Sequence, residues 1–177
     1  MFRIGILGAA DIAFNRFLPA LEKVQGVQCA GVASNSPDKL RRFVDKYNIH
    51  VYESYDEVIQ DENVDCIYVP LPPVFHYEWA KKALLAGKHV FLEKPSTISA
   101  EQTRELVWLA GSMGLVLQEN YMFQYHAQLA DIEKIIASGE LGKLRLVRTS
   151  FGFPRRAGGD FRYVKAVSYT HLTLPTS

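Results

Sequence analysis

The sequence has little of several features that mark particular classes of protein. It contains only two cysteines in 177 residues, and Cys29 and Cys66 each lie within an apolar run. This placement predicts two buried, reduced thiols rather than a disulfide framework. The 20 lysine and arginine residues nearly balance the 19 aspartate and glutamate residues. A net charge so close to zero gives no reason to expect binding to nucleic acid, to a membrane surface or to an acidic partner.

Long hydrophobic runs are also absent from the sequence. No apolar segment reaches the ~18 residues of a membrane-spanning helix, and the opening MFRIGILG lacks the basic region and cleavage site of a signal peptide. We therefore expect the protein in the cytoplasm. A domain of about 150 residues buries roughly 68–70% of its unfolded surface, so a chain of this length can form a core without a disulfide. We predict no bound metal.

What the sequence does contain is a regular alternation of short apolar runs and helical patterns. The predicted strands are 2–8, 27–33, 50–52, 66–72, 89–92 and 115–121. The predicted helices are 11–24, one that begins at 37, 55–60, 74–86 and one from 99 to just before 114. Because the strands are apolar rather than alternating, they favour a parallel sheet covered on both faces. We predict an α/β fold with a doubly wound parallel (Rossmann) sheet in the order 3-2-1-4-5-6.

Two of the predicted helices have clear start signals. Ser36 is a typical N-cap residue, Pro37 suits the first helical position, and Asp38 lies in the first turn. Ser99 and Gln102 have the spacing of a capping box, in which each side chain bonds to the backbone of the other. These signals predict where both helices begin.

From residue 122 onward the alternation stops. A predicted helix over 128–137 is followed by an apolar run over 144–153 with no crossover helix between them, which predicts the start of a second sheet. Residues 153–163 are rich in arginine and glycine and read as a loop. The last segment, 167–177, contains VSYTHLTLPT, which resembles the translation of a sequencing adaptor. We exclude this tail from the fold prediction.

Four segments that are far apart in the sequence are expected to meet at one edge of the sheet. Residues 8–10, 70–73, 93–95 and 119–120 each follow or end a predicted strand. In a doubly wound fold, ligands bind in the crevice at the carboxyl ends of the strands. The sequence therefore predicts a ligand site at this edge.

The first of these segments has a weak form of a dinucleotide-binding fingerprint. The pattern G-x-G-x-x-G is met as Gly8-x-Ala10-x-x-Ala13. Gly8 allows a tight turn and Ala13 is small enough for close packing, while Ala10 crowds a pyrophosphate slightly. The following helix would direct its first amides at the phosphates, although the charge of Asp11 mildly disfavours an anion there. An ordinary strand–turn–helix without a nucleotide fits the pattern equally well.

The end of the second strand bears on the choice of cofactor. An NAD site usually has an aspartate or glutamate here, but residues 33–36 contain no carboxylate. Ser34, Asn35, and Lys39 or Arg42 can instead donate hydrogen bonds to a 2′-phosphate. We therefore predict NADP rather than NAD, with NAD still possible. The alternative is that Lys39 and Arg42 belong to a solvated helix face.

Lys94 is the predicted catalytic residue. It follows a buried strand at the ligand-binding edge, and Pro95 restricts the backbone after it. An ammonium at this place can donate to a substrate hydroxyl or carbonyl and take part in proton transfer. His76 lies in the first turn of its helix, which favours a neutral ring that forms hydrogen bonds. An ordinary surface lysine and a capping histidine are the competing interpretations.

Taken together, these residues resemble the Gfo/Idh/MocA family, which includes glucose–fructose oxidoreductase and inositol dehydrogenase. The resemblance covers residues 1–166. It rests on RIGILGAADIA (3–13), the spaced P-x-P-x-x-x-H-x-E-W-A (70–80), AGKHVFLEKP (86–95), ENYMFQYHAQ (119–128) and SGELGKLR (138–145).

The resemblance implies transfer of a hydride between a nicotinamide cofactor and the C–OH or C=O of a sugar or polyol, with Lys94 as the catalytic lysine. The substrate would be a sugar or, more narrowly, a nucleotide-linked keto-sugar. The resemblance assigns residues 8–13 to the pyrophosphate, Pro72 and His76 to the nicotinamide ribose, and Glu93 and Glu119 to the cleft. The full set of cofactor residues that it implies is Gly8, Ala9, Ala10, Asp11, Ile12, Ala13, Leu71, Pro72, His76, Glu93, Lys94 and Glu119.

Members of this family are about twice as long as this chain. We therefore expect an NAD(P)-binding domain over 1–121, the truncated start of a C-terminal α+β domain for substrate and oligomer contacts over 122–166, and an adaptor-derived tail over 167–177. The full-length protein would form a homo-oligomer, and the fragment alone would be inactive. Two rival hypotheses are a non-catalytic dinucleotide-sensing module and a fragment that does not fold stably.

Overall fold

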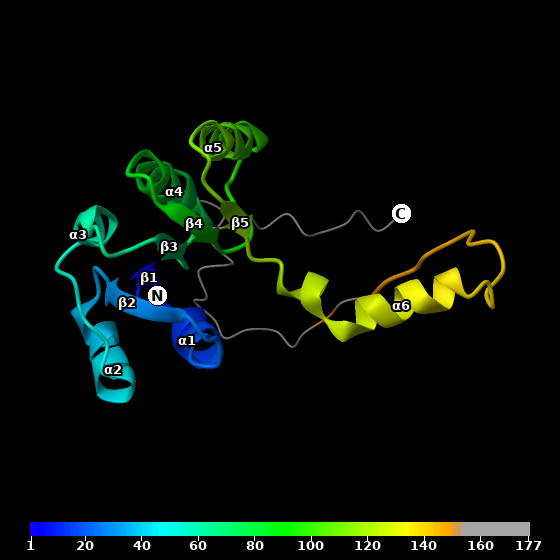
Figure 1. Cartoon of the computed structure of the whole chain (residues 1–177), viewed down its shortest axis with the longest axis horizontal. Coiled ribbons are helices and arrows are strands. Elements are labelled where there is room, and N and C mark those ends of the chain that lie inside the picture. Colours follow the sequence, from blue (N-terminus) through cyan, green and yellow to red (C-terminus); the bar gives the residue numbers. More distant parts are fainter. Residues whose placement is uncertain (151, 153–177) are drawn as a thin grey trace. The chain divides into compact units, whose positions relative to one another are not determined.

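The computed structural model describes residues 1–150 and 152. The chain forms two compact units, Met1–Asn120 and a second that begins at Tyr121. The first unit contains one sheet of five strands in the order β2-β1-β3-β4-β5, and all neighbouring strands run parallel (Figure 1). The strands are β1 (Phe2–Leu7), β2 (Val27–Ala33), β3 (Cys66–Val69), β4 (His89–Leu92) and β5 (Leu117–Glu119). The predicted doubly wound α/β fold is confirmed.

The predicted strand over 50–52 is reduced to a single bridge. Val51 pairs with Val32 of β2, held by one hydrogen bond from the Val32 amide to His50 O and one from the Tyr52 amide to Val32 O. The segment therefore lies beside β2, where the predicted strand order puts it. Two hydrogen bonds are too few to extend the pairing into a ladder, so the sheet has five strands rather than the predicted six.

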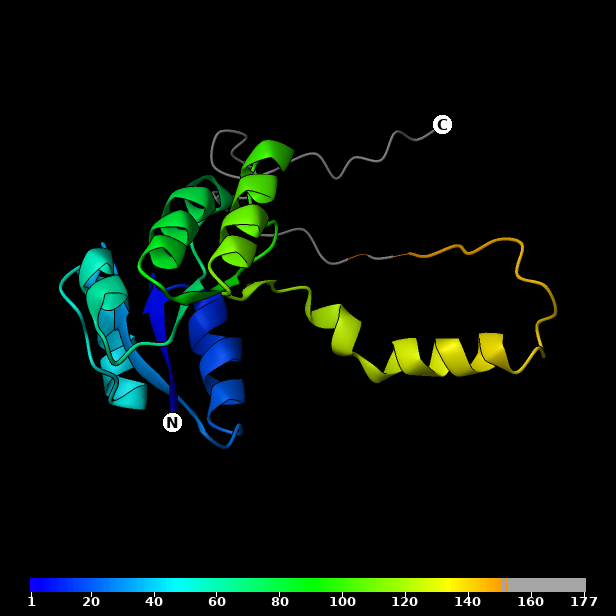
Figure 2. The same ribbon diagram turned by 45° about the horizontal axis from the view of Figure 1, so that its top comes forward.

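Helices cover the sheet from both sides, and each side has its own apolar core. On one face, α3 (Tyr55–Gln60), α4 (His76–Leu85) and α5 (Ala100–Ser112) bury a cluster that includes Ile67 and Leu92. On the other face, α1 (Leu18–Leu21) and α2 (Pro37–Tyr47) pack against side chains that include Ile6. Figure 2 shows α4 and α5 side by side on their face of the sheet. Among the described residues, no helix has the length and apolar character needed to cross a bilayer.

The predicted helix over 11–24 is less regular than its pattern indicates. It contains a π-helical turn, η1 (Ala13–Phe17), before α1. Pro19 has no amide hydrogen to donate to the turn before it, which favours a wider turn at this point. Leu18 and Leu21 are buried as their spacing predicts.

The predicted helix caps are confirmed in part. Ser99 Oγ accepts a hydrogen bond from the Gln102 amide at 3.2 Å, but Gln102 Oε1 is buried without a partner among the described residues. The reciprocal bond of the predicted capping box is therefore absent. Ser36 is the N-cap of α2 with Pro37 after it, yet its side chain accepts no capping bond. The Ser36 amide donates instead to Ser34 Oγ at 3.1 Å.

Both cysteines are free thiols. Cys66 is buried and Cys29 is half-buried, and burial raises the pKa of each thiol to about 12. Thiols with such a high pKa are not ionised near neutral pH and are poor nucleophiles. The prediction of reduced thiols is confirmed, with Cys29 more exposed than expected.

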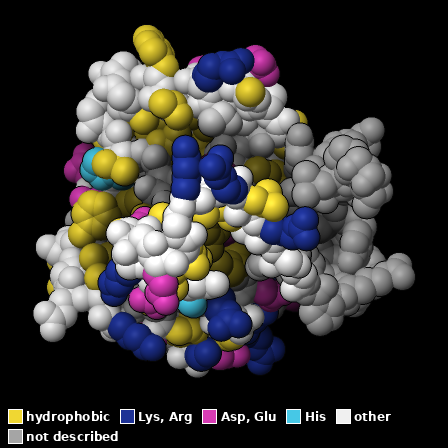
Figure 3. Space-filling model, turned by 90° about the vertical axis from the view of Figure 1, so that its right-hand side faces the viewer, with side chains coloured by type: hydrophobic (Ala, Val, Ile, Leu, Met, Phe, Trp, Pro, Cys, Tyr) yellow, Lys and Arg dark blue, Asp and Glu magenta, His cyan; other side chains and the backbone are white. Residues whose placement is uncertain are grey.

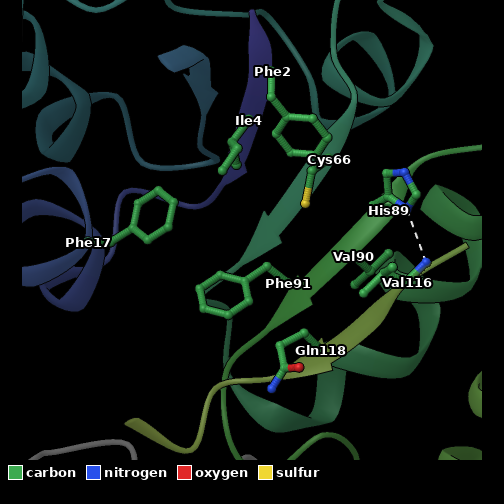
Figure 4. A pocket seen from close by; sticks show the side chains of 9 residues that line it. All are labelled: Phe2, Ile4, Phe17, Cys66, His89, Val90, Phe91, Val116 and Gln118. Atoms are coloured by element: carbon green, nitrogen blue, oxygen red, sulfur yellow. Dashed lines mark hydrogen bonds between the residues drawn. The ribbon is translucent and has the colours of Figure 1, made fainter. Parts of the chain in front are cut away.

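One face of the sheet carries an apolar hollow of about 410 Å³ (Figure 4). The residues that line it are Phe2, Ile4, Phe17, Cys66, His89, Val90, Phe91, Val116 and Gln118. The lining contains none of the predicted cofactor residues, and several of its members lie where strands begin rather than where they end. This hollow is therefore distinct from the predicted ligand-binding edge, and we base no site on it.

The described part of the second unit contains little regular structure. It has the short 3₁₀ turn η3 (Met122–Tyr125) and the helix α6 (Ala127–Ala137), which confirms the helix predicted over 128–137. The predicted strand over 144–153 does not form in its described part, because residues 144–150 pair with no other described segment. The predicted loop over 153–163 and the tail over 167–177 lie outside the described residues.

Candidate active site

The turn after β1 requires glycine at its first position. Gly8 has a φ of 104°, which only glycine adopts readily, and a Cβ there would lie 2.7 Å from Leu71 Cδ2. The Gly8 amide donates to Ala33 O at 2.7 Å, which ties this turn to the end of β2. Ala9 and Ala13 are buried, while Asp11 is exposed and Ile12 half-buried. The turn therefore lies close against the ends of β2 and β3.

Arg42 reaches the same turn from α2. Its Nη1 lies 2.7 Å from Asp11 Oδ1, and its Nη2 donates to Ala9 O at 3.2 Å. The guanidinium also lies over the Phe14 ring, with Cζ 4.7 Å from the ring centroid. The charge of Asp11, which on sequence grounds disfavours an anion at the turn, is thus balanced by Arg42. Sequence reasoning did not predict this pair, because its members are 31 residues apart (42 − 11).

The other predicted 2′-phosphate donors are Ser34 and Asn35, which lie between β2 and α2, and Lys39, which lies in the first turn of α2. Ser34 is half-buried and accepts the Ser36 amide bond, while Asn35 and Lys39 are exposed. Among the described residues, Arg42 bonds to the turn after β1, whereas no hydrogen bond or ion pair joins Ser34, Asn35 or Lys39 to it.

His76 joins two of the strand ends. Its side chain is fully buried, Nε2 lies 2.6 Å from Leu71 O, and Nδ1 lies 2.9 Å from Pro95 O. Burial lowers the pKa of His76, in agreement with the neutral ring expected from the sequence. Both ring nitrogens face main-chain carbonyl oxygens, and the ring lies between the segment after β3 and the segment after β4. Because a neutral ring carries one N–H, it donates to only one of these two oxygens at a time.

Glu93 is held from two sides at the end of β4. Its Oε1 accepts hydrogen bonds from Tyr68 Oη at 2.8 Å and from Asn120 Nδ2 at 2.7 Å. Burial, together with the carboxylate of Glu93, raises the pKa of Tyr68 well above its usual range. The hydroxyl group of a tyrosine in a buried strand needs a polar partner. This is the one sequence signal that could have predicted the contact.

Glu119 holds the backbone just beyond Lys94. Its Oε1 accepts a hydrogen bond from the Ser96 amide at 2.7 Å. Glu93 and Glu119, both assigned to the cleft on the resemblance, therefore bond to neighbouring strand ends within the chain. Together with His76 they fix the segment from Glu93 to Ser96.

The Lys94 side chain differs from its neighbours. It is exposed, and within the described residues no hydrogen bond or ion pair holds its ammonium. The peptide bond between Lys94 and Pro95 is cis. A fixed backbone that carries a free ammonium at the edge where β1, β3, β4 and β5 end has the geometry to donate a proton to a bound oxygen.

The sequence predicted which segments meet at this edge. The ends of β1 and β3 touch through Gly8 and Leu71, the ends of β3 and β4 touch through His76, and the ends of β4 and β5 touch through Glu93 and Asn120. Pro72, between Leu71 and the short turn η2 (Pro73–Phe75), is half-buried beside this chain of contacts. Tyr68 and Ser96 are members of the site that sequence reasoning missed, whereas Asn120 belongs to the predicted segment 119–120 and only its bond to Glu93 was not predicted.

Proteins that resemble this chain in fold and sequence include oxidoreductases. A family model described as "Oxidoreductase family, NAD-binding Rossmann fold" (GFO_IDH_MocA) matches residues 2–121. The chain is 40% identical over 161 residues to a dTDP-3,4-didehydro-2,6-dideoxy-alpha-D-glucose 3-reductase of Actinomadura kijaniata, which covers 91% of this chain and 48% of that protein. It is 32% identical over 157 residues to D-xylose 1-dehydrogenase (NADP(+)) 2 of Haloferax volcanii, which covers 88% and 48%.

A solved structure resembles the chain over nearly its whole length. This crystal structure, of a 3-ketoreductase from Actinomadura kijaniata in complex with NADP and TDP-benzene, has a TM-score of 0.88 and 39% identity. The match covers 94% of this chain and 51% of that chain. The present chain thus spans about half the length of the curated relatives that it matches.

Proposed function

Because this chain belongs to the Gfo/Idh/MocA oxidoreductase family, we propose that it is the N-terminal, cofactor-binding part of a longer NAD(P)-dependent oxidoreductase. The enzyme passes a hydride between a nicotinamide cofactor and the carbon of a sugar or polyol C–OH or C=O group. The observation that carries this proposal is the free Lys94 ammonium on a segment fixed by Glu93, His76 and Glu119.

The proposed cofactor is NADP. Relatives of the chain are named for or crystallised with NADP. The end of β2 offers no carboxylate that would repel a 2′-phosphate, and the donors proposed for this group are Ser34, Asn35, Lys39 and Arg42. The turn over residues 8–13 would hold the pyrophosphate on its amides, and the absence of a Cβ at Gly8 leaves room for the Leu71 side chain to pack against this turn.

The nicotinamide end of the cofactor is assigned to the segment that follows β3 and to Lys94. Leu71 and Pro72 border this end, and Glu93, His76 and Glu119 act on it through the backbone that they hold. When bound, the reduced cofactor supplies a hydride to the carbonyl carbon of the substrate. The Lys94 ammonium donates a hydrogen bond to the carbonyl oxygen and gives it a proton as the hydroxyl forms; in the reverse direction the amine accepts that proton.

We propose a nucleotide-linked keto-sugar as the substrate of the longer enzyme. The support is the 3-reductase of Actinomadura kijaniata, named for a dTDP-linked didehydro sugar, and the solved 3-ketoreductase that holds TDP-benzene. The remaining substrate contacts would come from the part of the enzyme that follows this chain. Assembly of the longer protein into a homo-oligomer stays a prediction.

The proposal is tested by Lys94→Ala in the full-length enzyme. We expect kcat to fall by roughly 100- to 10,000-fold, since general acid catalysis contributes that much, while NADPH affinity stays within a few-fold of the original. Lys23→Ala removes another exposed lysine and is the matched control, with no change expected. Unchanged turnover in Lys94→Ala contradicts the catalytic assignment.

Titration of this chain with NADPH and NADH by fluorescence tests the cofactor proposal separately. We expect NADPH to bind more tightly than NADH. Binding of NADPH by the chain, together with no reduction of any keto-sugar by the full-length protein, would favour the dinucleotide-sensing module over an enzyme.

A further inference from the structure

We propose that His76 is a positioning residue that holds Lys94 in place through the carbonyl group of Pro95. The inference rests on the proposed function, because it explains how the protein keeps the proposed catalytic lysine at the cofactor-binding edge. It assigns His76 a part different from direct contact with the cofactor.

The position of the ring rules out a simple surface or capping role. His76 is the first residue of α4 and is fully buried, and it follows directly on the short turn η2. The chain therefore places a polar ring at the junction of two strand ends, where a buried polar group needs partners. Both of its partners are main-chain oxygens rather than side chains.

The two partners belong to different segments of the site. Leu71 O lies in the segment that follows β3, one residue before Pro72, and it is 2.6 Å from Nε2. Pro95 O lies directly after Lys94, and it is 2.9 Å from Nδ1. The imidazole thus spans the gap between the segment that borders the proposed nicotinamide site and the segment that carries the proposed acid.

Imidazole is well suited to this task because it is rigid and carries its two nitrogens on different sides of a planar ring. A neutral imidazole carries one N–H, so the tautomer with its proton on Nδ1 donates to Pro95 O, while Nε2 lies against Leu71 O. A displacement of the Pro95 backbone would also displace Lys94, because a peptide bond joins the two residues. Glu119 holds the next residue through the Ser96 amide at 2.7 Å, so the backbone after Lys94 is fixed from two sides.

The role of the ring can be separated from general stability with three variants of His76. His76→Leu keeps much of the volume and removes both contacts. His76→Asn carries its amide nitrogen near the place of Nδ1 and can still bond Pro95 O, whereas His76→Gln carries it near Nε2 and can bond Leu71 O instead. The control is Tyr52→Phe, which removes the 2.7 Å hydrogen bond to Asp61 and touches no residue of the site.

In the full-length enzyme, kcat is measured per NADPH-binding site, so that loss of folded protein does not count as loss of catalysis. We expect His76→Leu and His76→Gln to lower kcat by about 10- to 100-fold, the cost of a small misplacement of a reacting group, with KM for NADPH changed much less. His76→Asn should recover most of the loss, and Tyr52→Phe should leave kcat unchanged. A kcat of His76→Leu within about 2-fold of the original would overturn the proposal.

A second readout needs no activity. Hydrogen exchange of the Ser96 amide in this chain reports how firmly the backbone after Lys94 is held. We expect faster exchange in His76→Leu and His76→Gln than in His76→Asn or Tyr52→Phe. Equal exchange rates of the Ser96 amide in all four variants would contradict the proposal that His76 holds Pro95 in place. If Lys94→Ala leaves turnover intact, the proposed function fails, yet this exchange experiment still decides whether His76 holds the segment.

Discussion

The two units of this chain use apolar residues in opposite ways. In Met1–Asn120, side chains such as Ile6 and Leu84 are fully buried in the cores on either face of the sheet. In the unit that begins at Tyr121, Ile132 of α6 is 41% exposed and Leu146 is 73% exposed. Apolar side chains at the surface are also visible in Figure 3, where they lie among lysine and arginine side chains.

This difference shows what a local pattern can and cannot predict. The helix over 128–137 and the helices of the first unit have similar sequence signals, and all of them form. Burial of the apolar face of a helix, in contrast, depends on neighbours from distant parts of the chain. In the first unit, the strands of the sheet provide these neighbours. The predicted strand over 144–153 needed such a neighbour, and residues 144–150 remain without one among the described residues.

The largest expected difference between the units is in their contribution to stability. Leu84→Ala should lower the free energy of unfolding by about 2–5 kcal/mol, because it leaves a cavity in a packed core. Ile132→Ala should change it by less than about 0.5 kcal/mol. Both tryptophans, Trp79 and Trp108, lie in the first unit, so their fluorescence in urea follows this unit, while far-UV circular dichroism of the same samples follows the helices of both units. Equal losses in the two variants would contradict the comparison.

Within the first unit, the cofactor-binding edge should be more sensitive than the opposite edge. Gly8→Ala combines a positive φ with a clash against Leu71, so we expect a loss of stability of about 1–3 kcal/mol or more and loss of NADPH binding. Gly26→Ala is the control, because Gly26 also has a positive φ of 80° but has nothing within 4 Å of its Cβ position. It should cost only the strain of about 1–2 kcal/mol and leave NADPH binding intact.

Glu119 should stabilise the fold because its side-chain oxygen accepts a hydrogen bond, and not because it carries a negative charge. Glu119→Ala leaves the Ser96 amide without its partner, and we expect it to lower the free energy of unfolding by about 1–3 kcal/mol. Glu119→Gln keeps an oxygen at the same place and should lose much less. Thermal unfolding of the two variants checks this, and a Gln variant as unstable as the Ala variant would indicate that the negative charge is what the site needs.

The smallest expected effect is the pH dependence due to His76. Burial lowers the pKa of His76 in the folded chain, so the unfolded chain binds the proton more readily. Its contribution to stability is therefore complete above the unfolded pKa of about 6.5 and declines as the pH falls toward the folded pKa. Urea unfolding between neutral and mildly acidic pH should show this loss in the original chain and a weaker one in His76→Leu. The same slope in both would contradict it.

Much of the fold could be predicted from the sequence because its signals are local. Apolar runs of strand length, separated by helices with clear ends, predicted the parallel sheet, its strand order and the edge that carries both Gly8 and Lys94. The predicted strand over 50–52 was wrong because this segment is too short to pair beyond one bridge with Val32. The helix over 11–24 deviated because Pro19 alters the hydrogen bonding of the turn before it.

The interior of the site could not be predicted, because it depends on contacts between distant residues. From the sequence, a capping role for His76 is as plausible as a role in the site. Only the fold brings Pro95 O next to its ring. Glu93 reads as a cleft residue, yet Tyr68 and Asn120 bind its carboxylate. The sequence prediction considered the negative charge of Asp11 by itself, although the Arg42 guanidinium lies against this carboxylate in the structure.

We propose that the free ammonium of Lys94 faces the nicotinamide ring, and a crystal structure of this chain with NADP would show whether it does. We expect the pyrophosphate on the turn after β1 and the nicotinamide beside Leu71 and Pro72, with Lys94 Nζ directed at the space over the ring. A nicotinamide bound elsewhere, or a Lys94 side chain that turns away from it into solvent, would disprove this placement.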